Sequence, residues 1–181
     1  MAGRLDWSNR TLPRAAAVLG VVVVLTILAP PPAYGQMSLN LWACKKLEPR
    51  SQDFFFDLRY TQCGNQFTAK DPYVGLVAHL QNVNDHTRVT IEVSDPSGTP
   101  VWSRQLTYSP TAGYYYPNIR IWVVLPLAAD TQALAAENVR LTASMIQLTD
   151  KPAAERLGEW TLRVQADRAG TRTMKFTLTG P

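Results

Sequence analysis

The chain has 181 residues, of which 46% are hydrophobic and 18% are charged, and its formal net charge is +4. This length suits one domain with a buried core, preceded by a targeting segment. The charge is too weak and too dispersed to indicate a nucleic-acid-binding protein, which usually concentrates positive charge on one face.

Residues 1–35 have the organisation of a secretory signal peptide. Three arginines near the start precede the uncharged run "AAAVLGVVVVLTILA" (15–29), and Ala33 and Gly35 supply the small residues of a cleavage site. A basic start, an apolar centre and a small-residue exit are typical of such signals. We therefore expect cleavage after this segment and a single domain, residues 36–181, in a secreted or periplasmic location.

An uncleaved membrane anchor is the alternative for the same segment. If residues 12–29 were retained, they would hold the domain at a membrane, facing away from the cytosol. The uncharged run 15–29 would rise about 22 Å as a helix, which is short of the roughly 30 Å hydrocarbon core of a bilayer. This length favours the cleaved signal. Both alternatives place the domain outside the cytosol, where a nucleic-acid partner is not expected.

The chain contains two cysteines, Cys44 and Cys63. In an oxidising compartment an even number of cysteines indicates a disulfide. The bridge would close a loop of about 20 residues and stabilise the fold by about 3 kcal/mol in the chain-entropy model. Two free thiols are the alternative.

Several segments show the patterns of β-strands. "RVTIEV" (88–93) alternates apolar and polar residues, whereas "YVGLVAHL" (73–80) is apolar on both faces, as in a strand with both faces covered. The sequence "DPSG" (95–98) favours a type I turn between two strands. Strands are expected around 53–60 and at 73–80, 88–93, 101–108 and 118–127.

Residues 129–149 allow two interpretations. Leu134, Leu141, Met145 and Leu148 have helical spacing, and a capping residue precedes them. The stretch 139–148 also alternates as a strand would. We expect a short helical turn near 131–137 followed by a strand.

The chain closes on a β-hairpin, "LGEWTLRVQADRAGTRTMKFTL" (157–178). Apolar residues occupy every second position before the turn, from Trp160 to Ala166, and again after it, from Met174 to Leu178. Asp167 and Gly170 supply the turn. Each strand of this hairpin thus has one apolar and one polar face.

Together, these segments resemble the immunoglobulin-like β-sandwiches that are common in exported bacterial proteins. The resemblance rests on "FTAKDPYVGLVAHLQN" (67–82), "VTIEVSDPSGTPVW" (89–102) and "GEWTLRVQADRAGTRTMKFTL" (158–178). It implies an all-β, antiparallel sandwich and leaves the ligand open. Both cysteines precede Trp102, so any disulfide differs from the inter-sheet bridge of antibody domains.

The sequence contains few of the motifs that catalysis requires. It lacks the Gly-x-Ser-x-Gly elbow and a Gly-rich phosphate loop, and only His79 and His86 could act as imidazole bases. We expect His79 to be a structural residue of its strand and His86 a solvated loop residue. Their spacing does not suit a metal site, and "NVND" (82–85) lacks the EF-hand pattern. No catalytic residue, metal or cofactor is therefore expected.

The carboxylates that glycosidic chemistry would require lie in exposed positions. Candidate pairs drawn from Glu92, Asp95, Glu155 and Glu159 fall on outward-facing strand positions or turns. We interpret them as solvated residues, so the chain is not expected to be an enzyme.

Aromatic residues gather in one loop, "YSPTAGYYYPNIRIW" (108–122). Tyr114, Tyr115 and Tyr116 cannot all face the interior, and tyrosine suits both protein interfaces and carbohydrate stacking. With Trp102 on the preceding strand, they are the candidate binding residues; packing at the end of the sandwich is the alternative. We expect a non-catalytic module that binds a protein partner in the cell envelope. A carbohydrate-binding or carbohydrate-active protein is the alternative.

Overall fold

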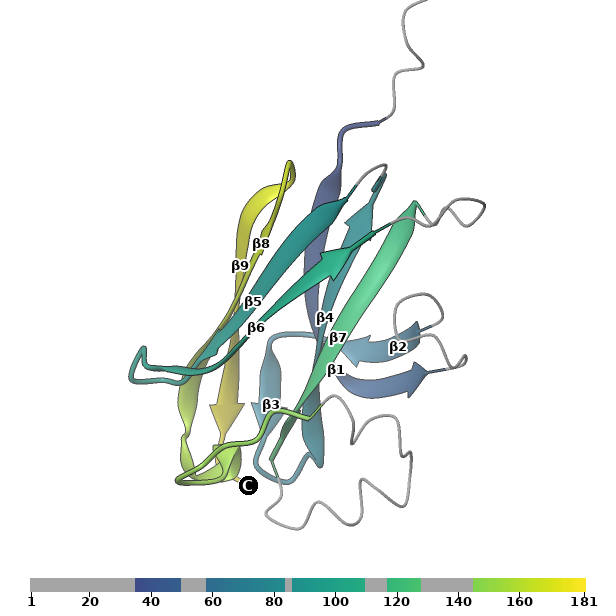
Figure 1. Ribbon diagram of the computed structural model, residues 1–181. Helices are drawn as coiled ribbons and strands as arrows, with labels where there is room; N and C mark the ends of the chain where they lie inside the picture. The colour runs from purple at the N-terminus through teal and green to yellow at the C-terminus, as the bar shows by residue number, and fades with distance from the viewer. Residues whose placement is uncertain (1–34, 50–57, 84–85, 110–116, 128–144) are drawn as a thin grey trace, which may run out of the picture. The chain divides into compact units, whose positions relative to one another are not determined.

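The computed structural model describes residues 35–49, 58–83, 86–109, 117–127 and 145–181. These residues belong to one compact unit, residues 34–181. Nearly all of its regular structure is β-strand (Figure 1). The strands are β1 (Ser38–Pro49), β2 (Leu58–Cys63), β3 (Gln66–Thr68), β4 (Tyr73–Gln81), β5 (Thr87–Ser94), β6 (Pro100–Tyr108), β7 (Asn118–Pro126), β8 (Gly158–Ala166) and β9 (Gly170–Thr179), and a 3-10 turn, η1, spans Ala153–Glu155.

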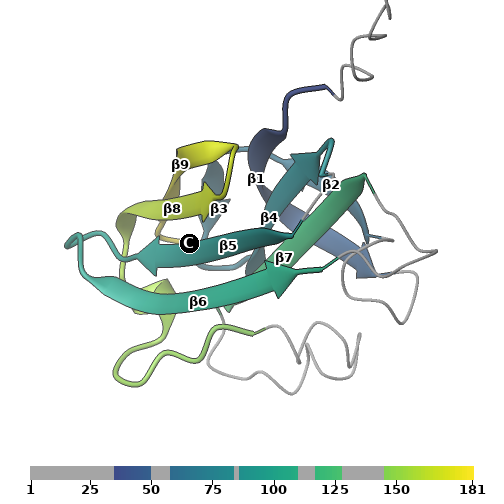
Figure 2. The ribbon, with the colours of Figure 1, turned by 45° about the horizontal axis from the view of Figure 1, so that its top comes forward.

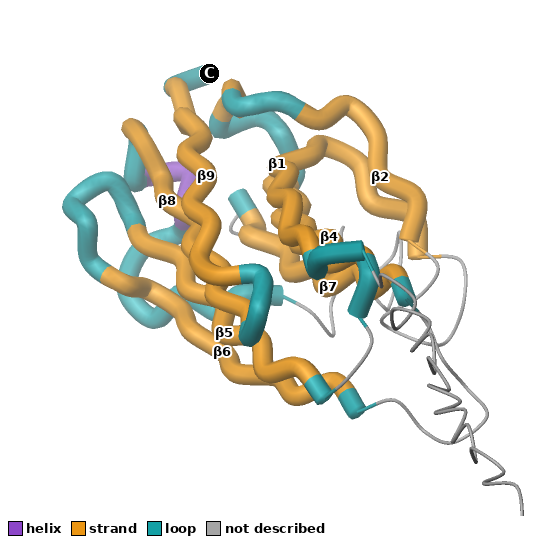
Figure 3. Tube along the Cα trace, turned by 90° about the horizontal axis from the view of Figure 1, so that it is seen from above, coloured by secondary structure: helices purple, strands orange, loops and turns teal. Residues whose placement is uncertain are grey.

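The strands form two sheets that pack face to face (Figures 2 and 3). One sheet has the order β2-β1-β4-β7 and the other has the order β3-β9-β8-β5-β6. All pairings between these strands are antiparallel except that between β3 and β9. Strands adjacent in sequence, β4 and β5 or β6 and β7, belong to different sheets, as in immunoglobulin domains. The predicted all-β, immunoglobulin-like sandwich is confirmed.

The main core lies between the two sheets, and on β5 and the hairpin β8–β9 it contains the inward-facing residues that the alternation predicted. On β5 the apolar residues Val89, Ile91 and Val93 are buried. On the hairpin β8–β9, Trp160 faces Phe176 across the pair and both are fully buried. Because successive strand side chains point to opposite faces, one face of each strand is removed from water while the other stays polar.

Most of the expected strands are present and close to their predicted ends. The segments 73–80, 88–93, 101–108 and 118–127 correspond to β4, β5, β6 and β7, and the hairpin at 157–178 corresponds to β8 and β9. The 12-residue strand β1 was not predicted. The strand expected around 53–60 overlaps the described β2 only at its end, Leu58–Tyr60, and residues 53–57 lie outside the described residues.

The expectations for residues 129–149 are tested only in part. The helical turn near 131–137 lies outside the described residues, as does most of the predicted strand 139–148. Within the described part, Met145 forms a single parallel bridge with Val124, and the next three residues are not in a strand. Ile146 donates its N–H to the Val124 carbonyl at 2.8 Å and is fully buried. The strand prediction is therefore wrong for residues 146–148.

A second apolar cluster covers the other face of the sheet β2-β1-β4-β7. It consists of the buried Cys44, Leu47, Leu58, Tyr73, Val77, Trp122 and Val124, with the partly buried Trp42, Tyr60 and Met145 packed against them. We refer to these residues as the outer cluster. The outer cluster explains why β4 is apolar on both of its faces, since one face meets the main core and the other meets this cluster.

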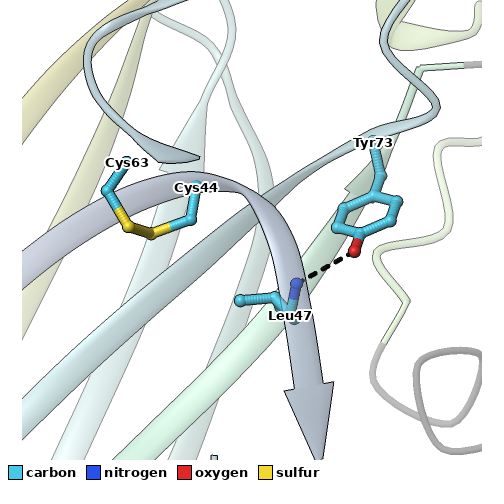
Figure 4. The surroundings of a disulfide bond; sticks show 4 residues. All are labelled: Cys44, Leu47, Cys63 and Tyr73. Carbon is cyan, nitrogen blue, oxygen red and sulfur yellow. Dashed lines mark hydrogen bonds between the residues drawn. A yellow bond between two sulfur atoms is a disulfide. The ribbon is translucent and has the colours of Figure 1, made fainter. Parts of the chain in front are cut away.

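Gly75 on β4 makes room for Leu47 of β1. A Cβ atom at Gly75 would lie 2.5 Å from Cγ and 2.6 Å from Cδ1 of Leu47. Leu47 is buried, and its backbone N–H donates to the Tyr73 hydroxyl at 3.0 Å, so the backbone that carries it is held in place (Figure 4). The absence of a side chain at residue 75 thus leaves room for the Leu47 side chain to pack against β4.

Gly75→Ala is therefore expected to destabilise the fold by about 1–3 kcal/mol, the usual range for overpacking. Urea unfolding measures the change, and Gly64→Ala is the matched control because a Cβ there meets nothing within 4 Å. Adding Leu47→Ala to Gly75→Ala should give a loss smaller than the sum of the single losses, because the clash disappears. Equal stability of Gly75→Ala and Gly64→Ala would contradict this packing.

Candidate functional site

The structure places one of the four predicted binding residues. Trp102 lies on the edge strand β6, opposite Val93 of β5, so it faces the main core. It is half-buried and packs against that core. Tyr114, Tyr115 and Tyr116 lie outside the described residues. A shared binding patch of Trp102 and the three tyrosines stays a prediction.

The predicted disulfide between Cys44 and Cys63 is confirmed. The two residues are directly opposite each other on β1 and β2, with their Cα atoms 3.9 Å apart (Figure 4). Cys44 is fully buried in the outer cluster, whereas Cys63 is exposed at the end of β2. Disulfides of this kind persist in oxidising compartments, which favours a location outside the cytosol. Among the described residues, no helix has the length and apolar character to cross a membrane.

His79 is the one buried histidine of the described residues, with 8% of its surface exposed. It lies on β4 beside the outer cluster, and its ring centroid is 5.8 Å from that of Trp42. The indole of Trp42 also meets the ring of Tyr60 at 5.4 Å. Burial lowers the pKa of His79, and the positive charge of Arg120, its neighbour on β7, lowers it further. His79 is therefore neutral in the fold and packs as an aromatic residue, as expected.

The lowered pKa of His79 predicts that the protein is less stable in weak acid than at neutral pH. Because the folded-state pKa of His79 lies below its ordinary value of 6.5, the unfolded chain binds a proton more readily. The stability that neutral His79 contributes is fully present above about pH 6.5 and is lost as the pH falls through the folded-state pKa of this residue. Urea unfolding at pH 7.5 and pH 5.5 should show a larger loss for the wild type than for His79→Phe. Identical losses in both proteins would rule out this source of pH dependence.

Two aspartates stay charged in that pH range and do not disturb the comparison. The pKa of Asp95 is lowered from 3.8, first by the hydrogen bond from the Ser97 hydroxyl and then by donors that include Thr99 and Arg156. At Asp71, burial raises the pKa, but hydrogen bonds from Thr68 and Lys45 outweigh it and the pKa is lowered. The stability that both carboxylates contribute is thus lost only below their ordinary pKa of 3.8.

Two of the four carboxylates singled out in the sequence, Asp95 and Glu159, form ion pairs. Asp95 was expected to be solvated, but only 12% of its side chain is exposed. It accepts hydrogen bonds from the Ser97 and Thr99 amides of its own turn and from Arg156 at 3.0 Å, so it joins the β5–β6 turn to the segment after η1. Glu159 is exposed and pairs with Lys175 at 2.7 Å. Within the described ranges, no three histidine, cysteine or acidic side chains gather to hold a metal ion.

An open pocket of about 300 Å³ lies where the two sheets separate, between β1 and β9. Leu41, Trp42 and Ala43 of β1 line one side, and Met174 of β9 lines the other. The turn between β2 and β3 closes one end with Cys63, Gly64 and Asn65. The lining is uncharged, and it joins an edge of one sheet to an edge of the other. Sequence analysis did not predict this pocket, because it missed β1 and, beyond the hairpin with β8, could not identify what lies beside β9.

No protein-family model and no curated protein matches the chain. Solved structures show a weak likeness. An immunoglobulin-like protein of Pseudomonas aeruginosa aligns over 81% of this chain and 98% of its own, with 14% identity and a TM-score of 0.37. A β-glucosidase of Listeria innocua aligns over 80% of this chain but only 16% of its own, with 9% identity and a TM-score of 0.36. The fold assignment rests on the strand order of this chain, and neither protein's function is transferred to it.

Proposed function

We propose that this protein is a non-catalytic interaction module, secreted or periplasmic, that binds a protein partner in the cell envelope. One observation carries the proposal: the sandwich leaves an uncharged pocket open between β1 and β9, next to stretches of these two strands that pair on one side only among the described residues. Such edges are used for binding when an extended segment adds to them.

Two further observations support this function. The Cys44–Cys63 bridge is typical of an exported domain. Two of the four carboxylates considered for glycosidic chemistry are used in ion pairs within the fold, Asp95 with Arg156 and Glu159 with Lys175.

Co-purification from native envelopes, compared with a glycan array, tests the proposal. A protein partner should be retained by the purified exported protein, and glycans should not be. Retention of a polysaccharide that is lost in Tyr115→Ala, without a protein partner, would instead support the carbohydrate-binding alternative and overturn the proposal.

A further inference from the structure

One long edge of the sandwich lacks a neighbouring strand among the described residues. Strand β9 pairs with β8 along its length, from Gly170 to Leu178. On its other side it pairs with β3 only through Thr177, Leu178 and Thr179. In Figure 1, β3 accordingly lies beside only the C-terminal end of β9. Residues 170–176 therefore form an open edge, and we use that name for them below.

The hydrogen bonds to β3 show which backbone groups point toward the open edge. Thr177 donates its N–H to the Asn65 carbonyl at 2.7 Å, and the Thr179 carbonyl accepts from the Ala69 N–H at 2.9 Å. Alternate residues of a strand direct their backbone groups to the same side. The N–H and C=O groups of Thr171, Thr173 and Lys175 therefore point away from β8. They form a row of donors and acceptors that another strand can pair with.

The pocket adjoins this row on the inner side of the sheet. Met174 faces inward, opposite Leu162 of β8, and forms one wall of the pocket. A strand added along the open edge would also direct every second side chain inward. One such side chain would enter the space between Met174 and Leu41. The volume of about 300 Å³ suits a large apolar side chain, since an engineered cavity of about 150 Å³ holds benzene.

Positive charge surrounds the open edge. Arg172 and Lys175 on β9 and Arg163 on β8 are all exposed. Two acidic residues lie beside these three cations: Glu159 pairs with Lys175, and Glu92 of β5 lies opposite Arg163. A net positive edge attracts acidic segments and disfavours a second copy of the same edge, because like charges would then face each other.

We propose that the open edge of β9 accepts an extended, acidic segment of a partner protein as an additional strand, with one large apolar side chain in the pocket between β9 and β1. The inference rests on the proposed function and specifies its surface and the chemistry of its partner. The partner segment alternates apolar and acidic residues, so that its apolar side chains face the pocket and its acidic side chains lie on the face of the sheet that carries Lys175 and Arg163.

A peptide library tests this proposal on the purified exported protein. Random 12-residue peptides selected on the wild type should become enriched in alternating apolar and acidic residues. Thr173→Pro removes one N–H that points to the open edge and leaves the bonds to β8 intact, since proline is tolerated on edge strands. It should weaken binding of the selected peptides at least tenfold. Thr173→Ala keeps the N–H and is the matched control, with affinity expected within twofold of the wild type.

A second variant examines the pocket. Gly64 has open space around it, so Gly64→Trp should fill the pocket without disturbing the backbone, and Gly64→Ala is its control. Gly64→Trp should also weaken binding tenfold or more. Circular dichroism identifies any variant that fails to fold, and either folded variant suffices for the comparison.

Two outcomes would overturn the inference: selection of peptides without this pattern, or equal binding of the selected peptides to the wild type and to every variant that folds. If an envelope partner binds Thr173→Pro as well as the wild type, strand addition fails while the proposed function stands. If neither the wild type nor Thr173→Pro retains an envelope partner, the proposed function fails together with strand addition.

Discussion

Trp160→Ala is expected to destabilise the protein by about 3–5 kcal/mol, the range for deleting a large buried aromatic side chain. The indole is fully buried in the main core, stacked against Phe176 with ring centroids 6.3 Å apart. Its Nε1–H donates to the Arg156 carbonyl at 2.9 Å, which fixes the segment after η1 against β8. The alanine variant loses this packing and leaves the Arg156 carbonyl without its donor.

Trp160→Phe separates the two contributions. Phenylalanine keeps most of the apolar volume but cannot donate to the Arg156 carbonyl. Trp160→Phe should therefore lose clearly less stability than Trp160→Ala. Thermal unfolding should show the alanine variant melting about 10 °C or more below the wild type. A destabilisation below about 1 kcal/mol for Trp160→Ala would contradict the burial of this residue.

Reduction of the Cys44–Cys63 bridge is expected to destabilise the protein by about 3 kcal/mol in the chain-entropy model. The bridge joins residues 19 apart in sequence, so reduction frees the loop between β1 and β2 in the unfolded chain. Cys63 is exposed, which gives a reductant access to the bridge in the folded protein. The melting temperature should fall by several degrees in dithiothreitol.

The variant with both cysteines replaced by alanine is the control for this experiment. Its melting temperature should be low from the start and should not respond to the reductant. An unchanged melting temperature of the wild type, with two thiols titrating in the native state without reductant, would contradict the bridge.

The fold was predictable from sequence wherever one strand face is apolar and the other is polar. Strand β5 and the hairpin β8–β9 show this alternation plainly, because each lies between the main core and water. Strand β1 was missed because its apolar pattern is irregular: Leu39 faces the main core and Trp42 meets the outer cluster, and the charged pair Lys45–Lys46 then interrupts the apolar positions. Such a stretch matches neither the alternation of a half-buried strand nor the apolar run of a fully buried one.

The proposed binding surface was much less predictable. Sequence patterns identify which side chains of a strand face inward, but they do not identify its neighbours in the sheet. The open edge depends on β3 being only three residues long and pairing with the last residues of β9. The pocket depends on Met174 and Leu41, which are 133 positions apart in sequence and lie together only in the sandwich. Sequence analysis instead predicted a binding site at Tyr114, Tyr115 and Tyr116, because three consecutive tyrosines are recognisable in the sequence without knowledge of the fold.

Amide hydrogen exchange tests strand addition at β9 most directly. With a selected acidic peptide bound, exchange at the amides of Thr171, Thr173 and Lys175 should slow at least tenfold. The amides of Arg172 and Met174, which already face β8, should change little. Unchanged exchange at the three odd-numbered positions while the peptide is bound would contradict the account.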